Sequence, residues 1–203
     1  VADTDILVID GGGTALYSGF QAAPLERFRN VVSLNAISSM GTAPGQMIGA
    51  LEAQPKDRVI GIIGDGSFVM ALNALPSISS NSNAFLIVIT NGGYLAIRHT
   101  QERFLGSRFD GTWNPGKNDL PSVRKISESL GFRYFEYSME SSPPVEEMLN
   151  PRITPNAATV IEVYTDPSQE PFWSVDSEFD HRTGKPVPLP LSIMTNGFGA
   201  IDA

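Results

Sequence analysis

The sequence has no cysteine and only two histidines, His99 and His181, among its 203 residues. The missing thiols exclude disulfides, thiolate nucleophiles, zinc–thiolate sites and cysteine-ligated iron–sulfur clusters. Two histidines are also too few for a multi-histidine metal site. These absences remove whole classes of catalytic and metal chemistry before any motif is considered.

Long hydrophobic runs and a surplus of basic residues are missing as well. No apolar stretch approaches the roughly 20 residues that cross a bilayer, and the start of the chain lacks the basic and apolar regions of a signal peptide. A cytoplasmic protein is therefore expected. The net charge of −8 argues against nucleic acid as a partner, because phosphate backbones are bound by clustered Lys and Arg. We expect neither a membrane nor a nucleic-acid partner.

The remaining composition, with 41% hydrophobic and 18% charged residues, is that of an ordinary globular protein. Short apolar runs alternate with helix-like segments along most of the chain. Strands are predicted at 5–9, 31–34, 58–63, 85–90, 133–137 and 159–164, and helices at 15–29, from 44, from 67, and at 94–104, 122–130 and 145–149. This alternation predicts an α/β fold with a doubly wound, mostly parallel sheet and helices on both faces. We expect one domain over residues 1–165 and an irregular, Pro-rich tail over 166–203.

Two of the predicted buried strands end in motifs that carry oxygen ligands. Gly64-Asp65-Gly66-Ser67 follows one strand, and Asn91-Gly92-Gly93 follows the next, 26 residues after Asp65. The Asp65 carboxylate, the Asn91 amide oxygen and the Gly93 carbonyl are hard oxygen donors of the kind that Mg²⁺ prefers. A magnesium ion held there leaves positions for a diphosphate.

The alternative is that Asp-Gly and Asn-Gly are only turn dipeptides, since Asn-Gly is a leading hairpin signal. A hairpin at Asn91 is disfavoured because the following segment 94–101 has a helical rather than an alternating pattern. A third reading, a nucleotide site at Gly11-Gly12-Gly13, lacks the spacing of a dinucleotide fingerprint because Leu16 stands where its last glycine belongs.

The two motifs, GDGS and NGGY, resemble the C-terminal, diphosphate-binding domain of thiamine diphosphate (ThDP) enzymes. Residues 39–50 and the segment 94–109 are most similar to the acetolactate synthase and 2-oxo acid decarboxylase branch. The resemblance covers roughly residues 5–165. It implies that ThDP and Mg²⁺ are the cofactors and that a small 2-oxo acid is the substrate.

The resemblance also implies roles for individual positions. The Mg²⁺ ligands would be Asp65, Asn91 and the Gly93 carbonyl. The cofactor-binding residues would be Gly13, Thr14, Ser38, Met40, Gly64, Gly66 and Ser67. Within that set the Ser38 carbonyl would face the pyrimidine, and Met40 would lie under the cofactor. Ile97 and Gln101 would face the substrate side.

By this resemblance the chain is the Mg²⁺/diphosphate-binding half of a decarboxylase or carboligase, a carbon–carbon lyase or transferase component. The activating glutamate is expected on a separate pyrimidine-binding (Pyr) domain, in the same longer chain or in another subunit of a homo- or hetero-oligomer. The alternatives are the β-type subunit of a two-subunit sulfopyruvate or phosphonopyruvate decarboxylase, or a non-catalytic protein with the same fold. Val69 and Ala74 depart from the family pattern, and Pro76 is expected to end or kink the helix that starts near Ser67, at a cost of about 3 kcal/mol.

Overall fold

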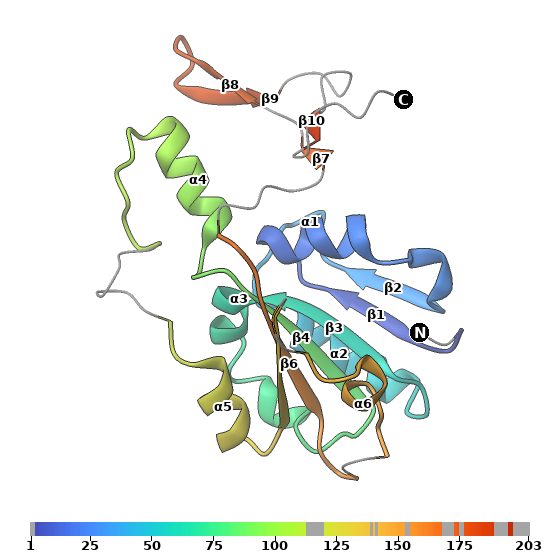
Figure 1. The fold of residues 1–203 in the computed structure, drawn as a ribbon. Coiled ribbons are helices and arrows are strands. Elements are labelled where there is room, and N and C mark those ends of the chain that lie inside the picture. Colours follow the sequence, from blue (N-terminus) through green and yellow to red (C-terminus); the bar gives the residue numbers. More distant parts are fainter. Residues whose placement is uncertain are drawn as a thin grey trace.

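The computed structural model describes residues 3–112, 120–138, 140, 142–152, 155–167, 173–174, 177–188 and 195–196. A six-stranded parallel sheet runs through its centre in the order β2-β1-β3-β4-β6-β5 (Figure 1). The strands are β1 (Ile6–Ile9), β2 (Asn30–Ser33), β3 (Val59–Gly64), β4 (Ala84–Thr90), β5 (Arg133–Tyr137) and β6 (Thr159–Tyr164). The helices are α1 (Gly13–Ala22), α2 (Ala43–Ala53), α3 (Asp65–Met70), α4 (Leu95–Phe104), α5 (Val123–Ser129) and α6 (Val145–Met148), with 3₁₀ turns η1 (Leu25–Arg27) and η2 (Leu75–Ser77).

Both faces of the sheet are apolar and both are covered. Successive strand residues point to opposite faces, so Ile6 and Val8 of β1 join the core beneath α2, α3 and α5. Leu7 and Ile9 join a second core with side chains of α1, η1 and the Leu149 turn after α6. The prediction of a doubly wound α/β fold is therefore confirmed.

The strand order reverses between β1 and β3. From β1 the chain moves outward to β2, and from β3 it continues in the other direction through β4. At such a reversal the loops that leave neighbouring strands turn to opposite faces and open a crevice at the carboxyl edge of the sheet. The loops after β1 and β3, which carry Gly13 and Asp65, flank this crevice.

Helix α2 packs on β3 with almost no space between them. A Cβ atom at Gly61 would collide with Sδ of Met47 and lie 2.9 Å from Cδ1 of Leu86. Met47 itself is fully buried. Glycine at this strand position lets α2 approach the sheet closely.

The helix after the GDGS motif is shorter than the sequence predicts. Helix α3 ends at Met70, before the chain reaches Pro76. Pro76 instead lies in the first turn of η2, where the missing backbone N–H costs nothing. It therefore does not interrupt a helix in this structure.

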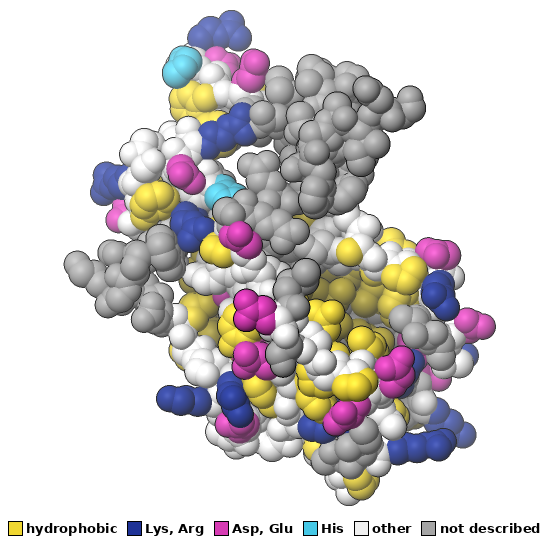
Figure 2. Space-filling view, viewed as in Figure 1, with side chains coloured by type: hydrophobic (Ala, Val, Ile, Leu, Met, Phe, Trp, Pro, Cys, Tyr) yellow, Lys and Arg dark blue, Asp and Glu magenta, His cyan; other side chains and the backbone are white. Residues whose placement is uncertain are grey.

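The described part of the tail contains short strands that its composition does not predict. Strands β8 (Ser177–Asp180) and β9 (Lys185–Pro188) form an antiparallel hairpin, and β7 (Trp173–Ser174) pairs with β10 (Thr195–Asn196). The hairpin contacts α4, because the rings of Phe179 and Phe104 stack at 5.9 Å. Among the described residues no helix is long and apolar enough to span a bilayer. On the face drawn in Figure 2, basic and acidic side chains lie interspersed over the lower part of the molecule.

Candidate functional site

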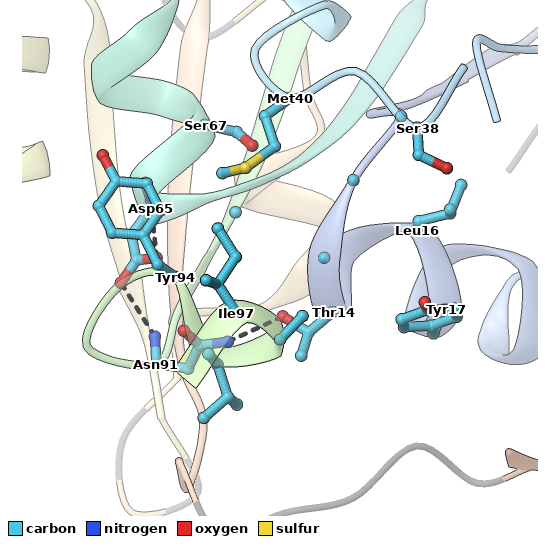
Figure 3. A pocket seen from close by; sticks show the side chains of 17 residues that line it. Thr14, Leu16, Tyr17, Ser38, Met40, Asp65, Ser67, Asn91, Tyr94 and Ile97 are labelled. Atoms are coloured by element: carbon cyan, nitrogen blue, oxygen red, sulfur yellow. Dashed lines mark hydrogen bonds between the residues drawn. The ribbon is translucent and has the colours of Figure 1, made fainter. Parts of the chain in front are cut away.

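A cavity of about 250 Å³ lies at the carboxyl edge of the sheet, where the strand order reverses (Figure 3). It is built by the loops that follow β1, β2, β3 and β4. Ten of the twelve residues singled out from the sequence line it: Gly13, Thr14, Ser38, Met40, Gly64, Asp65, Gly66, Ser67, Asn91 and Ile97. Segments separated by up to 84 positions in the chain thus meet at one site.

The loop after β1 and the loop after β2 are in direct contact. A Cβ atom at Gly11 would lie 2.5 Å from the carbonyl oxygen of Ser39, and one at Gly12 would lie 2.7 Å from Cγ of Met40. Real Cβ atoms do not approach so closely, so both positions require glycine. Gly13 has a different reason, since its φ is +66° and the space above it is open.

Asp10 ties the same two loops together, a role that the sequence analysis missed. Its carboxylate is fully buried and accepts backbone hydrogen bonds from Gly41 (3.2 Å), Thr42 (2.8 Å) and Ala43 (3.0 Å). These N–H groups lie at the start of α2. Asp10, which directly follows β1, therefore caps a helix that begins more than 30 positions later in the chain. The signal in the sequence was a charged residue placed directly after a buried apolar strand.

Asp65 is 5% exposed and is surrounded by backbone N–H donors. Its Oδ2 atom accepts from Asn91 (3.2 Å), Gly92 (3.0 Å) and Gly93 (2.9 Å), and Oδ1 accepts from Gly66 (2.8 Å). Burial raises the pKa of Asp65 above its ordinary value, and the four amide bonds partly oppose that shift. The carboxylate thus fixes the backbone of the Asn91 loop as well as offering an oxygen ligand.

The side chain of Asn91 is oriented by a partner on another element. Its Nδ2 atom donates to Oγ1 of Thr14 at 2.8 Å, so its amide oxygen points away from Thr14 (Figure 3). No cluster of three or more His, Asp or Glu side chains in the described segments could hold a metal. The Asp65 carboxylate and the Asn91 carboxamide are oxygen ligands of the kind that Mg²⁺ accepts together with phosphate or water oxygens.

Tyr94 packs on the turn that carries Asp65. A Cβ at Gly66 would lie 2.8 Å from Cε1 of Tyr94, so the ring rests directly on the GDGS turn (Figure 3). Tyr94 has φ +28° and Ser38 has φ +53°, a backbone conformation that non-glycine residues rarely adopt. Two strained residues on opposite sides of one cavity are typical of a functional site.

A diphosphate fits the remaining wall of the cavity. Helix α1 begins at Gly13 with Gly12 as its N-cap, a residue without a side chain to occupy the free N–H groups. Unpaired N–H groups at a helix start attract phosphate oxygens. The Thr14 hydroxyl lies on the same helix, beside Asn91.

Two predicted site residues do not line the cavity. Gly93 contacts it indirectly, through the hydrogen bond from its N–H to Asp65. Gln101 is buried in the next turns of α4, where its amide nitrogen donates to the Asp110 carbonyl at 2.9 Å and its oxygen accepts from Thr112 Oγ1 at 2.7 Å. It organises the segment after α4. Leu16, Tyr17 and Ala96 line the cavity and were not singled out from the sequence.

Comparison with known proteins agrees with this arrangement. The chain matches the sequence profile described as "Thiamine pyrophosphate enzyme, C-terminal TPP binding domain" over residues 11–163. It is 27% identical over 154 residues to acetolactate synthase isozyme 1 large subunit of Escherichia coli (strain K12), covering 74% of this chain and 26% of that protein. It is 30% identical over 116 residues to the acetolactate synthase large subunit of Porphyra purpurea, covering 55% of this chain and 19% of that protein.

A solved structure shares the fold. The thiamine diphosphate-dependent 4-hydroxybenzoylformate decarboxylase of Rhodococcus jostii RHA1 superposes with a TM-score of 0.61 at 22% identity, over 81% of this chain and 30% of that chain. The match to the E. coli relative described above covers about a quarter of that protein's length. On the match that covers residues 11–163, this chain belongs to the family of thiamine pyrophosphate enzyme C-terminal domains.

Proposed function

We propose that this chain binds the Mg²⁺ complex of ThDP and forms the metal- and diphosphate-binding half of a 2-oxo acid decarboxylase or carboligase of the acetolactate synthase kind. One observation carries the proposal. The Asp65 carboxylate, the Asn91 amide and the start of α1 at Gly13 converge on one cavity, at the reversal of strand order. This combination provides both metal ligands and phosphate donors.

In the proposed complex, Asp65, Asn91 and the Gly93 carbonyl hold Mg²⁺. Gly13, Thr14 and Ser67 line the phosphate side of the same cavity. Backbone N–H groups and the metal together balance the phosphate charge, which is how a chain of net charge −8 accommodates an anionic cofactor.

The other walls suit the organic part of the cofactor. Met40 supplies an apolar surface against Gly12, and the carbonyl oxygen of Ser38 faces the same glycine, because a Cβ atom at Gly12 would lie 3.5 Å from it. Tyr94, resting on Gly66, restricts water from the Asp65 carboxylate. ThDP, when bound, supplies the electron sink that makes loss of CO₂ from a 2-oxo acid feasible, while these residues bind and orient it.

The cavity needs a partner to become a closed active site. Tyr17 and Ile97 line it and are 47% and 46% exposed, so its rim is apolar and open. We infer that a Pyr domain, carrying the activating glutamate, covers this rim in a homo- or hetero-oligomer. The length of the E. coli relative, about four times the matched region, leaves room for such a domain.

Cofactor binding is tested by calorimetric titration of the full chain with ThDP in the presence of Mg²⁺ or of EDTA. Heat of binding that requires Mg²⁺, and that is lost in Asp65→Ala but kept in Asp3→Ala at an exposed surface position, supports the proposal. Tight binding of NAD in place of ThDP would contradict it. Thermal unfolding of each variant confirms that the loss concerns the site.

Turnover is tested by adding a Pyr-domain protein and pyruvate to the loaded chain. Release of CO₂ with a 2-hydroxy-2-methyl-3-oxo acid as product indicates carboligation, and release of free aldehyde indicates simple decarboxylation. ThDP binding without CO₂ release would identify a non-catalytic protein of this fold, the outcome that Val69 and Ala74 would then explain.

A further inference from the structure

A buried carboxylate lies behind the Asn91 loop, outside the cavity. Glu162 of β6 is 4% exposed. Its Oε1 atom accepts a hydrogen bond from Thr90 Oγ1 at 2.8 Å, and Oε2 accepts one from Tyr134 OH at 2.6 Å. A buried charge costs several kcal/mol unless it is paired or hydrogen-bonded. Each oxygen of Glu162 has one short hydroxyl partner.

Thr90 is the last residue of β4 and directly precedes Asn91. Strand β6 and the residue that follows it hold Thr90 in place: Glu162 accepts from its side chain, and the N–H of Thr165 donates to its carbonyl at 3.0 Å. The next three residues donate their N–H groups to Asp65 on the other side. Hydrogen bonds therefore lead from Glu162 through Thr90 to the loop that carries Asn91.

One side of this loop packs against Leu120 at Gly93, and the other side borders open space. A second cavity, of about 660 Å³, lies behind it and is lined by Thr90, Asn91, Gly92, Tyr164 and Thr165 among others. Gly92 and Gly93 both have positive φ and no side chain to anchor them. The position of this glycine loop therefore depends on hydrogen bonds: those that Asp65 accepts from its three N–H groups and those that hold Thr90 at its start.

A carboxylate is an unusual residue for this buried position of the sheet. Glu162 stands between Ile161 and Val163 in a strand paired on both sides, and replacing buried charges by apolar residues is often neutral or stabilising. Tyr134 remains a hydrogen-bond donor, because burial and the contact with Glu162 raise its pKa far above the ordinary tyrosine value. Its hydroxyl satisfies the second oxygen and leaves the first for Thr90.

We propose that Glu162 is a positioning residue that fixes the end of β4 through Thr90 and thereby holds Asn91 where a metal ion can be bound. The part about the metal rests on the proposed function, whereas the part about the order of the loop does not. The role predicts that removing the Thr90 hydroxyl disturbs residues 91–93 more than removing the Tyr134 hydroxyl does.

The experiment uses the full chain in four forms: wild type, Thr90→Val, Glu162→Gln and Tyr134→Phe. Thr90→Val keeps the shape of the side chain and removes its donor. Glu162→Gln keeps an acceptor for Thr90 and is the conservative rescue. Tyr134→Phe removes the other hydrogen bond of the same carboxylate and is the matched control.

Two measurements are made on each protein. Amide hydrogen exchange at Asn91, Gly92 and Gly93, without cofactor, reports the order of the loop. Titration with Mg²⁺ and ThDP reports the affinity of the site. We expect Thr90→Val to speed exchange at these three amides and to weaken Mg²⁺-dependent ThDP binding by ~10-fold or more, as loss of a residue that orients a metal ligand does. Glu162→Gln and Tyr134→Phe should stay within about threefold of wild type, because in both variants Thr90 keeps an acceptor at position 162.

Unchanged exchange and affinity in Thr90→Val would overturn the proposal. Equal effects of Thr90→Val and Tyr134→Phe would also overturn it, because they would indicate a general loss of packing. Failure of the wild type itself to bind Mg²⁺ and ThDP would reject the proposed function, and hydrogen exchange in Thr90→Val would still decide whether the hydrogen bond from Thr90 to Glu162 orders the loop.

Discussion

The Nδ2 atom of Asn91 and the Oγ1 atom of Thr14 lie 2.8 Å apart and join the loop after β4 to the first turn of α1. The two residues come from strands on opposite sides of the reversal in strand order. Their contact sets which way the Asn91 amide faces, and so it links the metal side of the cavity to the phosphate side.

Replacement of Thr14 by valine should weaken Mg²⁺-dependent ThDP binding by about 2- to 10-fold, because the Asn91 amide loses the acceptor that orients it. Thr14→Ser keeps the hydroxyl and should bind like wild type. Calorimetric titration measures both. A Thr14→Val protein with wild-type affinity would show that Asn91 is oriented by the cofactor alone.

Asp65 should make the stability of the metal-free protein depend on pH. Burial raises its pKa above 3.8 in the folded state, so the folded protein holds the proton more tightly than the unfolded chain does. The resulting stabilisation is fully present below pH 3.8 and is lost as the pH rises through the folded-state pKa. Over this window the free energy of unfolding of wild type should fall relative to that of Asp65→Asn, which cannot titrate.

Urea unfolding of both proteins at a series of pH values, with EDTA present, tests this expectation. Mg²⁺ needs the ionised carboxylate, so metal-dependent stabilisation should grow as the pH rises through the same range. If the free energies of unfolding of wild type and Asp65→Asn changed with pH in the same way, the pKa of Asp65 would be the same in the folded and unfolded states, and the prediction would be wrong.

Gly61→Ala should lower the free energy of unfolding by about 1–3 kcal/mol, because its methyl group would overlap Sδ of Met47 in a closely packed core. Gly49→Ala, on α2 with no atom within 4 Å of the added methyl, should instead stabilise by about 0.5–1 kcal/mol through helix propensity. Urea denaturation compares the pair. A lower free energy of unfolding in Gly61→Ala together with a higher one in Gly49→Ala would confirm that the contact with Met47, and not the replacement of glycine as such, decides the effect.

Asp10→Asn should destabilise the protein by about 1–3 kcal/mol, because an amide NH₂ would face some of the buried donors that start α2. Exposed Asp3→Asn serves as the control and should change stability by less than about 0.5 kcal/mol. The Asp10 variant should also bind ThDP more weakly, since Met40 lies directly before the capped residues. If the destabilised Asp10→Asn protein bound ThDP with full affinity, the hydrogen bonds of Asp10 to the start of α2 would matter for stability and not for the binding site.

The sequence was most informative where local pattern and chemistry coincide. Apolar runs that end in Gly64-Asp65-Gly66 and in Asn91-Gly92-Gly93 predicted both strands and the meeting of their motifs, because parallel strands share one carboxyl edge. The structure places Asp65 and Asn91 in one cavity, as the spacing predicts.

Contacts between distant segments were not predictable in the same way. The Asp10 cap, the Thr14–Asn91 bond and the Glu162–Thr90 bond each join residues more than 30 positions apart, and no periodicity encodes them. Gln101 lies on the predicted helix but contacts Thr112, because a helical pattern gives the face of a residue and not its hydrogen-bond partner. The early end of α3 at Met70 likewise depends on tertiary packing.

Freedom to change is unevenly distributed around the cavity. No side chain can be added at Gly11, where the Ser39 carbonyl already occupies the space, or at Gly66, which lies beneath the Tyr94 ring. Helices α1 and α4 each present a replaceable side chain there, Tyr17 and Ile97, and both side chains are nearly half exposed. Adaptation of such a domain to a new substrate must therefore proceed through these two helices or through the protein surface that closes over them, while the glycine walls stay fixed.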